Sequence, residues 1–278
     1  MIKPFCFSVD QIVSSEEARV HPLDIGLIRG YAIFDFFRTV HFQPLFLDDY
    51  LERFISSAQR LRLPLALSKE DLERVIFLLI EKNKLEQGGI RMVLTGGVSD
   101  NHFSPTAGSL FIFCEALQMP SAEKYEHGVK LLSEEYIRPL AGIKTTNYTL
   151  PVWLSSSWKD VAAEDVVYHF NGIISESSRS NIFMVKNGEL ATPASNILLG
   201  VTRRNVLKLA GGAQERDITL TELLNADEVF MTSTTKRILP VTQIDGTLIK
   251  DGRPGPFTQG LMAQFEGLER DQQAVGKI

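Results

Sequence analysis

Two Asn-Gly dipeptides, each set between strand-like runs, constrain the fold more than any other feature of this sequence. Asn171-Gly172 joins DVVYHF to IISES, and Asn187-Gly188 joins NIFMVK to ELATP. The two central residues of a type I′ hairpin turn need positive φ, which Asn and Gly adopt most readily. The dipeptides therefore predict antiparallel hairpins and a strand-rich region over residues 165–193.

The first third of the chain has a different pattern. Residues 48–61 place apolar side chains at helical spacing, and residues 68–85 begin with Ser68 and Asp71, the spacing of a capping box. Residues 90–97 and 109–117 are apolar runs bounded by polar turns, which predicts two neighbouring strands. Shorter helical patterns follow within residues 150–159, 202–211 and 221–226.

The polar segment 118–126 contains a proline and predicts a linker between two domains. The predicted organisation is a small α/β domain over residues 1–119 and a larger, strand-rich domain over residues 120–278. At 278 residues, the chain is long enough for both.

Composition excludes several classes of protein. The 29 Lys and Arg residues and 34 Asp and Glu residues give a net charge of −5 without a long basic block, so we expect no nucleic-acid partner. The longest apolar runs, such as residues 75–80, are too short to span a bilayer. Cys6 and Cys114 show no paired spacing, the N-terminus lacks a signal-peptide pattern, and the five histidines show no ligand spacing. We therefore expect a cytoplasmic protein without a metal or a membrane partner.

Several polar sites stand out, although each also has an ordinary structural interpretation. Gly200 precedes a helix that starts near Thr202, where free N–H groups favour an anion, but the same pattern describes a simple helix cap. Ser233–Thr235 gives adjacent hydroxyls after a strand-like run, as a phosphate site or a polar turn would. Glu176, Arg53 and Lys144, taken singly, are indistinguishable from surface charges.

Together these residues supply what pyridoxal 5′-phosphate needs: a lysine, an acidic partner for the ring nitrogen and donors for the phosphate. The order of the motifs resembles the class IV, or fold-type IV, aminotransferases over nearly the whole chain. The motifs are RGYAIFDFFR, YLERFISSAQRL, IKTTNY, ISESSRSNIFMVKNGELATP with LLGVTRR, and TSTTKRILPV. The resemblance implies an α+β fold with a small α/β domain and a larger pseudo-barrel domain, and a homodimer with small-molecule substrates.

The resemblance also implies a role for each matching residue. Lys144 is the implied Schiff-base lysine and proton shuttle, and Glu176 the implied partner of the ring nitrogen. The implied phosphate ligands are Arg53, Val201, Thr202, Ser233 and Thr234, and Tyr148 is placed near the phenolic oxygen of the cofactor. One departure is Tyr50, where many members of the family carry histidine.

Arg29, Arg91 and Arg179, together with Thr235, fall where the family lines its substrate pocket. A guanidinium suits a carboxylate, so the expected substrates carry the α-carboxylate and a second carboxylate, as D-glutamate and 2-oxoglutarate do. Lys144-x-x-Asn147 and Ser233–Thr235 resemble D-amino-acid transaminases, whereas Tyr148 and Arg91 also fit branched-chain enzymes. The predicted activity is therefore D-amino-acid transamination, with branched-chain L-amino-acid aminotransferase and aminodeoxychorismate lyase as alternatives.

Overall fold

The computed structural model describes residues 1–275, which divide into two compact units. The N-terminal unit comprises residues 1–118, the short segment Ile143–Asn147 and the described residues from Asp271 onward. The C-terminal unit comprises Met119–Gly142 and Tyr148–Arg270. Each unit is described by itself below.

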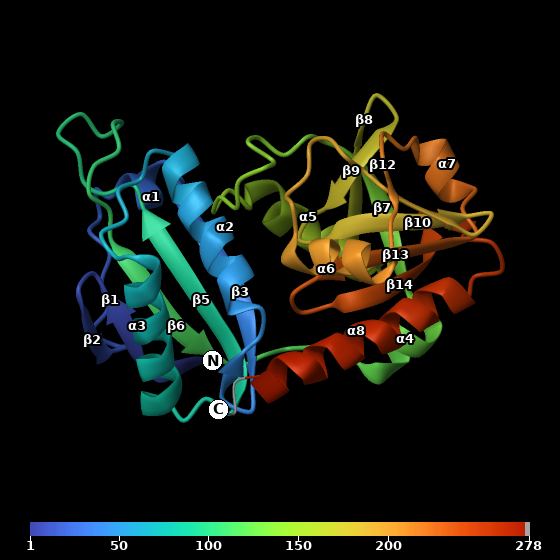
Figure 1. The fold of residues 1–278 in the computed structure, drawn as a ribbon. Helices are drawn as coiled ribbons and strands as arrows, with labels where there is room; N and C mark the ends of the chain where they lie inside the picture. Colours follow the sequence, from blue (N-terminus) through green and yellow to red (C-terminus); the bar gives the residue numbers. More distant parts are fainter. Residues whose placement is uncertain (276–278) are drawn as a thin grey trace. The chain divides into compact units, whose positions relative to one another are not determined.

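The N-terminal unit is built on a six-stranded sheet with the order β2-β1-β6-β5-β3-β4. Helices α2 and α3 lie on one face of this sheet (Figure 1). The elements are β1 (Ile2–Ser8), β2 (Gln11–Ser14), α1 (Ile25–Ile28), β3 (Ala32–Val40), β4 (Gln43–Pro44), α2 (Leu47–Arg60), α3 (Lys69–Lys82), β5 (Gln87–Thr95) and β6 (Leu110–Glu115).

Three sequence predictions for this unit are confirmed. The apolar stripe of α2 is buried at Leu51, Phe54 and Ala58, as its helical spacing requires. Ser68 caps α3 by accepting a hydrogen bond from the Asp71 amide at 3.1 Å. The predicted neighbours β5 and β6 pair antiparallel.

The C-terminal unit contains a nine-stranded sheet with the order β12-β11-β10-β13-β14-β7-β8-β9, in which β15 pairs with β14. A further pairing of β9 with β10, between Glu176 and Asn181, closes part of the sheet into a barrel. The strands are β7 (Val129–Glu135), β8 (Asp165–Phe170), β9 (Ile173–Ser177), β10 (Asn181–Lys186), β11 (Glu189–Thr192), β12 (Gln214–Glu215), β13 (Glu228–Ser233), β14 (Arg237–Ile244) and β15 (Thr247–Leu248).

Helices cover this sheet: α5 packs on β8, α6 on β13, and α4 on β14 (Figure 1). They are α4 (Ala122–His127), α5 (Thr149–Asp160), α6 (Val201–Leu209), α7 (Leu220–Leu224) and α8 (Pro256–Val275). The core of this unit includes five fully buried side chains: Leu131, Val167, Ile182, Met231 and Leu239.

Both Asn-Gly predictions are confirmed. Asn171 and Asn187 have φ of 48° and 51°, and each following glycine also has positive φ. The two dipeptides join β8 to β9 and β10 to β11 in antiparallel pairs. The division between the two units falls after Gln118, at the start of the predicted linker 118–126. Most of that linker is helical, because α4 (Ala122–His127) begins within it.

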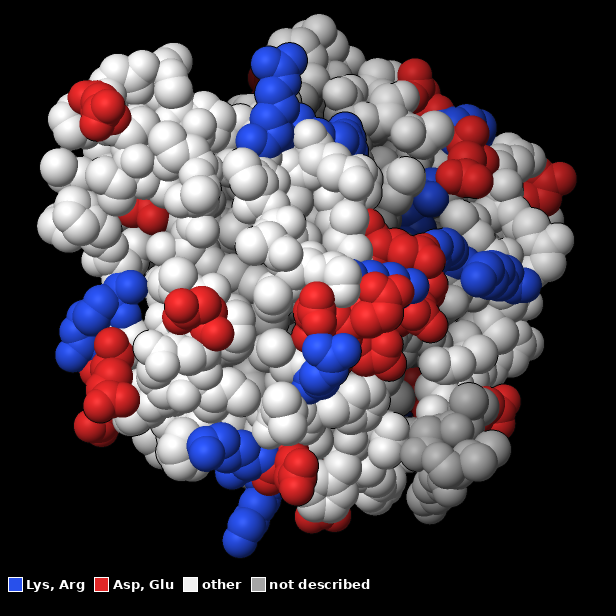
Figure 2. Space-filling model, turned by 60° about the vertical axis from the view of Figure 1, so that its left-hand side comes forward, with Lys and Arg blue, Asp and Glu red and all other residues white. Residues whose placement is uncertain are grey.

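Within residues 1–275, no helix is both long and apolar enough to cross a membrane. On the face drawn in Figure 2, the Lys and Arg side chains do not merge into a continuous basic surface, and several lie beside acidic ones.

Candidate functional site

Lys144 lies in the N-terminal unit, which differs from its predicted place in the domain 120–278. The reason is backbone pairing. The Phe34 amide donates to the Lys144 carbonyl at 2.9 Å, the Thr146 amide donates to the Ala32 carbonyl at 3.0 Å, and Ile33 forms a bridge with Thr145. These bonds hold the lysine segment against β3, which a linear reading of the chain does not show.

The ammonium group of Lys144 lies over an aromatic ring. Its Nζ is 4.6 Å from the centre of the Phe34 ring, and the guanidinium carbon of Arg91 is 5.5 Å from the same ring. Arg91 also bonds Glu115, with its Nη2 2.6 Å from the Glu115 Oε1. Lys144 and Arg91 therefore both contact the Phe34 ring, and Glu115 neutralises the charge of Arg91.

Arg53 is held by a carboxylate that sequence analysis did not single out. Asp35, fully buried on β3, accepts from Arg53 Nε at 2.9 Å and from Nη2 at 2.6 Å. This bidentate pair fixes the plane of the guanidinium and uses two of its five donors. One signal in the sequence could have indicated this pair. The aspartate lies inside the apolar run AIFDFF, where its side chain is expected to be buried, and a buried carboxylate needs a cation as its partner.

Arg29, at the C-terminal end of α1, is exposed. Its Nε donates to the His102 carbonyl at 3.3 Å, which joins it to the loop between β5 and β6.

In the C-terminal unit, Glu176 is 4% exposed and lies at the barrel closure. Arg138, also buried, donates from Nε to its Oε1 at 2.8 Å, and the Leu198 amide donates to its Oε2 at 2.8 Å. Sequence analysis missed Arg138, because nothing local distinguishes it from the other basic residues of the chain.

Tyr148 and Arg179 belong to the same electrostatic environment. Burial raises the pKa of the Tyr148 hydroxyl, while the charges of Arg138 and Arg179 act against that rise. The hydroxyl is therefore protonated at neutral pH and can donate a hydrogen bond. Arg179 itself is exposed, between the buried residues Ser178 and Ser180.

The start of α6 has the features of an anion site. Gly200 is its N-cap, no side chain among the described residues caps the helix, and its first turn contains no acidic residue. A Cβ at Gly200 would lie 2.3 Å from the Asn181 Oδ1, so a larger residue there would force the Asn181 side chain, which donates to the Leu198 carbonyl, to shift. Val201 and Thr202 are both buried in the first turn. N–H groups at such a helix end favour a phosphate.

Ser233 ends β13, Thr234 and Thr235 begin the turn that leads to β14, and all three are partly buried. The Ser233 Oγ accepts from the Lys236 amide at 3.1 Å. Because α6 packs on β13, the structure associates this turn and the α6 segment with the same strand.

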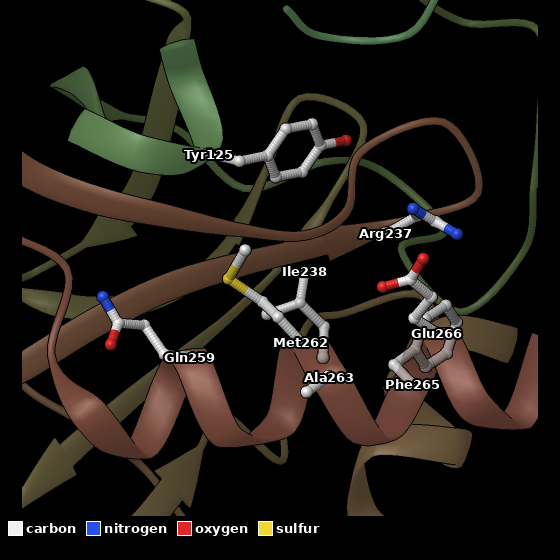
Figure 3. Close-up of a pocket in the computed structure, with 8 residues that line it drawn as sticks. All are labelled: Tyr125, Arg237, Ile238, Gln259, Met262, Ala263, Phe265 and Glu266. Atoms are coloured by element: carbon white, nitrogen blue, oxygen red, sulfur yellow. The ribbon is translucent and has the colours of Figure 1, made fainter. Parts of the chain in front are cut away.

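A separate groove of about 300 Å3 lies between α4, β14 and α8 (Figure 3). Its floor is apolar, and Arg237 lies at one end of it near Glu266. The groove is lined by none of the predicted site residues. It is lined by Tyr125, Arg237, Ile238, Gln259, Met262, Ala263, Phe265 and Glu266.

Comparison with known proteins identifies the family. The sequence profile of amino-transferase class IV matches residues 32–244. The chain is a class IV aminotransferase. This family uses pyridoxal 5′-phosphate.

Relatives of two specificities are similar to this class IV aminotransferase. A D-alanine aminotransferase of Listeria monocytogenes is 31% identical over 97% of this chain and 96% of its own. A protein of Methanocaldococcus jannaschii, provisionally named branched-chain-amino-acid aminotransferase, is 32% identical over 93% of this chain and 94% of its own. Branched-chain amino acid aminotransferase from Escherichia coli, a solved structure, superposes with a TM-score of 0.90 at 28% identity, covering 96% of this chain and 95% of its own. The fold is thus the α+β fold of fold-type IV enzymes, as predicted, and the chain is a transaminase by family.

Proposed function

We propose that this class IV aminotransferase transfers the amino group of a D-amino acid, D-glutamate above all, to a 2-oxo acid such as 2-oxoglutarate or pyruvate. The observation that carries the proposal is Arg179, an arginine on a turn whose neighbours are buried, with its charge acting on Tyr148. An arginine so placed suits a carboxylate substrate. The spacing Lys144-x-x-Asn147 and the D-alanine aminotransferases among the relatives support the same choice.

The side chains of this protein match each chemical group of the cofactor. Lys144 would offer the primary amine that holds the cofactor, and its Nζ would carry the proton during the transfer. Glu176, paired with Arg138, suits a protonated ring nitrogen, and Tyr148 can donate to the phenolic oxygen. When bound, pyridoxal 5′-phosphate supplies the electron-accepting ring that stabilises negative charge at the reacting carbon.

The phosphate has its own proposed ligands. The first-turn N–H groups of Val201 and Thr202, together with Ser233 and Thr234, would donate to its oxygens. Arg53 would add a charged donor, with its orientation set by Asp35. The glycine at position 200 supports this assignment, because a larger residue would displace the Asn181 side chain beside the start of α6.

The remaining proposed residues recognise the substrate. We assign the side-chain carboxylate of the substrate to Arg179 and its α-carboxylate to Arg29, with Thr235 as a further donor. Arg91 has a weaker claim as a carboxylate ligand, because Glu115 already neutralises its charge. Its position over the Phe34 ring instead suits a role in shaping the surroundings of Lys144.

Absorbance spectroscopy tests the activity. The holoenzyme should lose the visible band of the lysine-bound cofactor when D-glutamate or D-alanine is added, and should keep it with L-leucine. Loss with L-leucine alone would make the chain a branched-chain aminotransferase, as its M. jannaschii and E. coli relatives are named. Release of pyruvate from aminodeoxychorismate without an amino acceptor would establish the lyase alternative. A Lys144→Ala variant should lack the band.

Kinetics of an Arg179→Leu variant test the substrate assignment. Loss of a charge-assisted bond worth about 1.5–3 kcal/mol should raise KM for D-glutamate roughly 10- to 100-fold. The KM for D-alanine, which has no second carboxylate, should change much less. Arg74→Leu is the matched control, because Arg74 is an exposed helix residue that pairs with Asp71. Equal KM changes for both substrates would refute the role of Arg179.

We also propose that the protein is a homodimer of a reducing, cytoplasmic environment. Leu27 and Phe103, which are 59% and 78% exposed, flank the bond between Arg29 and His102 and offer an apolar surface for association. Cys6 and Cys114 are both free thiols. Light scattering should give twice the chain mass of 31.1 kDa, and a Phe103→Asp variant should shift it toward the single-chain value.

A further inference from the structure

Lys236 is a buried lysine in the C-terminal unit. It is 4% exposed, and its Nζ lies 3.0 Å from the Asp165 Oδ2 and 3.8 Å from the Glu164 Oε1. Asp165, the first residue of β8, is fully buried. Lysine is rarely buried, and a buried pair often gives no more stability than apolar residues of similar size. Overall stability alone is therefore a weak reason for this pair.

The second oxygen of Asp165 holds a serine of another segment. The Ser178 Oγ donates to Asp165 Oδ1 at 2.5 Å, and the Val166 amide donates to the same oxygen at 2.9 Å. Ser178 lies in the turn between β9 and β10, which the Ser177 amide closes by donating to the Ser180 carbonyl at 2.7 Å. The chain of contacts runs from Lys236 through Asp165 to this turn.

The Ser177–Ser180 turn joins two functional positions. Glu176 lies immediately before it, where β9 pairs with β10, and Arg179 lies inside it. Burial acts to raise the pKa of Asp165, but the charges of Lys236 and Arg179 and the Ser178 hydroxyl outweigh it and lower that pKa. Arg179 is thus close enough to Asp165 to act on its charge, and its direction depends on how Ser178 is held.

The backbone of Lys236 belongs to a second turn. Its amide donates to the Ser233 Oγ at 3.1 Å, and the Tyr125 hydroxyl donates to its carbonyl at 3.1 Å. The side chain and the backbone of one residue therefore link the Ser233–Thr235 turn to the Ser177–Ser180 turn.

We propose that Lys236 is a positioning residue, which acts through Asp165 and Ser178 to hold the Ser177–Ser180 turn and thereby aim Arg179 at the substrate. The substrate part of this inference rests on the proposed function of Arg179. The positioning of the turn does not, because it follows from contacts within one unit.

Hydrogen–deuterium exchange of the holoenzyme tests the positioning directly. Ser178→Ala breaks the last link and leaves the ion pair intact, and its peptides covering residues 175–182 should exchange about tenfold faster than those of the wild type. Ser155→Ala is the matched control, because the Ser155 Oγ donates to the Val152 carbonyl of its own helix α5, and the same peptides should be unchanged. Unchanged exchange in Ser178→Ala would overturn the proposal.

A second pair of variants tests Lys236 itself. Lys236→Met leaves the Asp165 carboxylate buried without its lysine, so Asp165→Leu combined with Lys236→Met provides a variant with an apolar pair that can fold. The Lys236→Met variant and the double variant should both exchange faster than the wild type over residues 175–182. Lys124→Met removes an exposed lysine that pairs with Glu164, and it should leave that exchange unchanged. Wild-type exchange in the folded double variant would overturn the proposal.

Kinetics separate positioning from a purely structural role. In the Ser178→Ala and double variants, KM for D-glutamate should rise about tenfold, KM for D-alanine less than twofold, and kcat with D-alanine should stay near the wild-type value. Equal effects on both substrates would overturn the aiming of Arg179. If the wild type does not use D-glutamate, the proposed function fails, and the exchange measurement still decides the positioning.

Discussion

Replacing Arg138 by methionine should destabilise the C-terminal unit strongly. Arg138 and Glu176 have side chains only 8% and 5% exposed, and their bond is 2.8 Å long. Arg138 also donates to the Ala141 carbonyl, a bond that the variant loses. Breaking one side of a buried ion pair costs about 3–5 kcal/mol. We therefore expect a loss of about 4 kcal/mol, which corresponds to a fall in Tm of roughly 8–16 °C for a unit of this size.

Tryptophan fluorescence of the cofactor-free protein provides the assay. The chain has two tryptophans, and both lie in α5 of the C-terminal unit. Trp158 is 6% exposed and packs against Tyr168, so its emission follows the unfolding of this unit. Absence of the cofactor removes the stabilisation that ligand binding adds to the folded state.

Two further variants decide whether the loss comes from the ion pair. Glu176→Gln in the Arg138→Met background removes the uncompensated charge and keeps an acceptor for the Leu198 amide, so it should recover most of the lost Tm. Arg203→Met is the control: Arg203 is equally buried, but its partner Glu215 is 51% exposed and remains solvated. Its Tm should fall much less. If the double variant shows no recovery, the reasoning from a buried uncompensated charge is wrong.

Three other outcomes are expected. Gly200→Ala should weaken binding of pyridoxal 5′-phosphate at least tenfold in fluorescence titrations, because its Cβ would lie 2.3 Å from the Asn181 Oδ1; Gly246→Ala, where a Cβ meets nothing within 4 Å, should bind normally. Burial raises the pKa of Cys114 to about 12, so iodoacetamide at pH 8 should leave this thiol unmodified in the folded protein. Modification of Cys114 found by mass spectrometry would contradict that burial. The lowered pKa of Asp165 contributes stability above its unfolded pKa of about 3.9, and that contribution is lost as the pH falls through the native pKa. The Tm difference between the wild type and Asp165→Asn should therefore shrink below pH 4, and a difference that grows there would refute the sign.

Local chemistry made much of the fold predictable. The Asn-Gly turns, the apolar stripe of α2 and the Ser68 cap depend on residues within a few positions of one another, so their patterns are visible in the sequence. The order of the motifs was enough to predict the family and its cofactor, and the class IV aminotransferase profile over residues 32–244 confirms the family. The roles of the individual site residues remain predictions.

Partners distant in the sequence were not predictable. Asp35 with Arg53, Arg138 with Glu176, and Lys236 with Asp165 are each brought together by folding, over separations of 18, 38 and 71 residues. A sequence shows that a buried charge needs a partner, but it does not show which of many opposite charges will be adjacent.

The sequence by itself determined the family, the hairpins and the residue types that suit pyridoxal phosphate, because these follow from short motifs. Only the tertiary structure decided that the Lys144 segment pairs with β3, that β9 meets β10 to close the barrel, and that a buried lysine anchors the turn carrying Arg179. The physical reason is that hydrogen bonds and ion pairs form between groups that are close in space, and chain order does not fix that closeness.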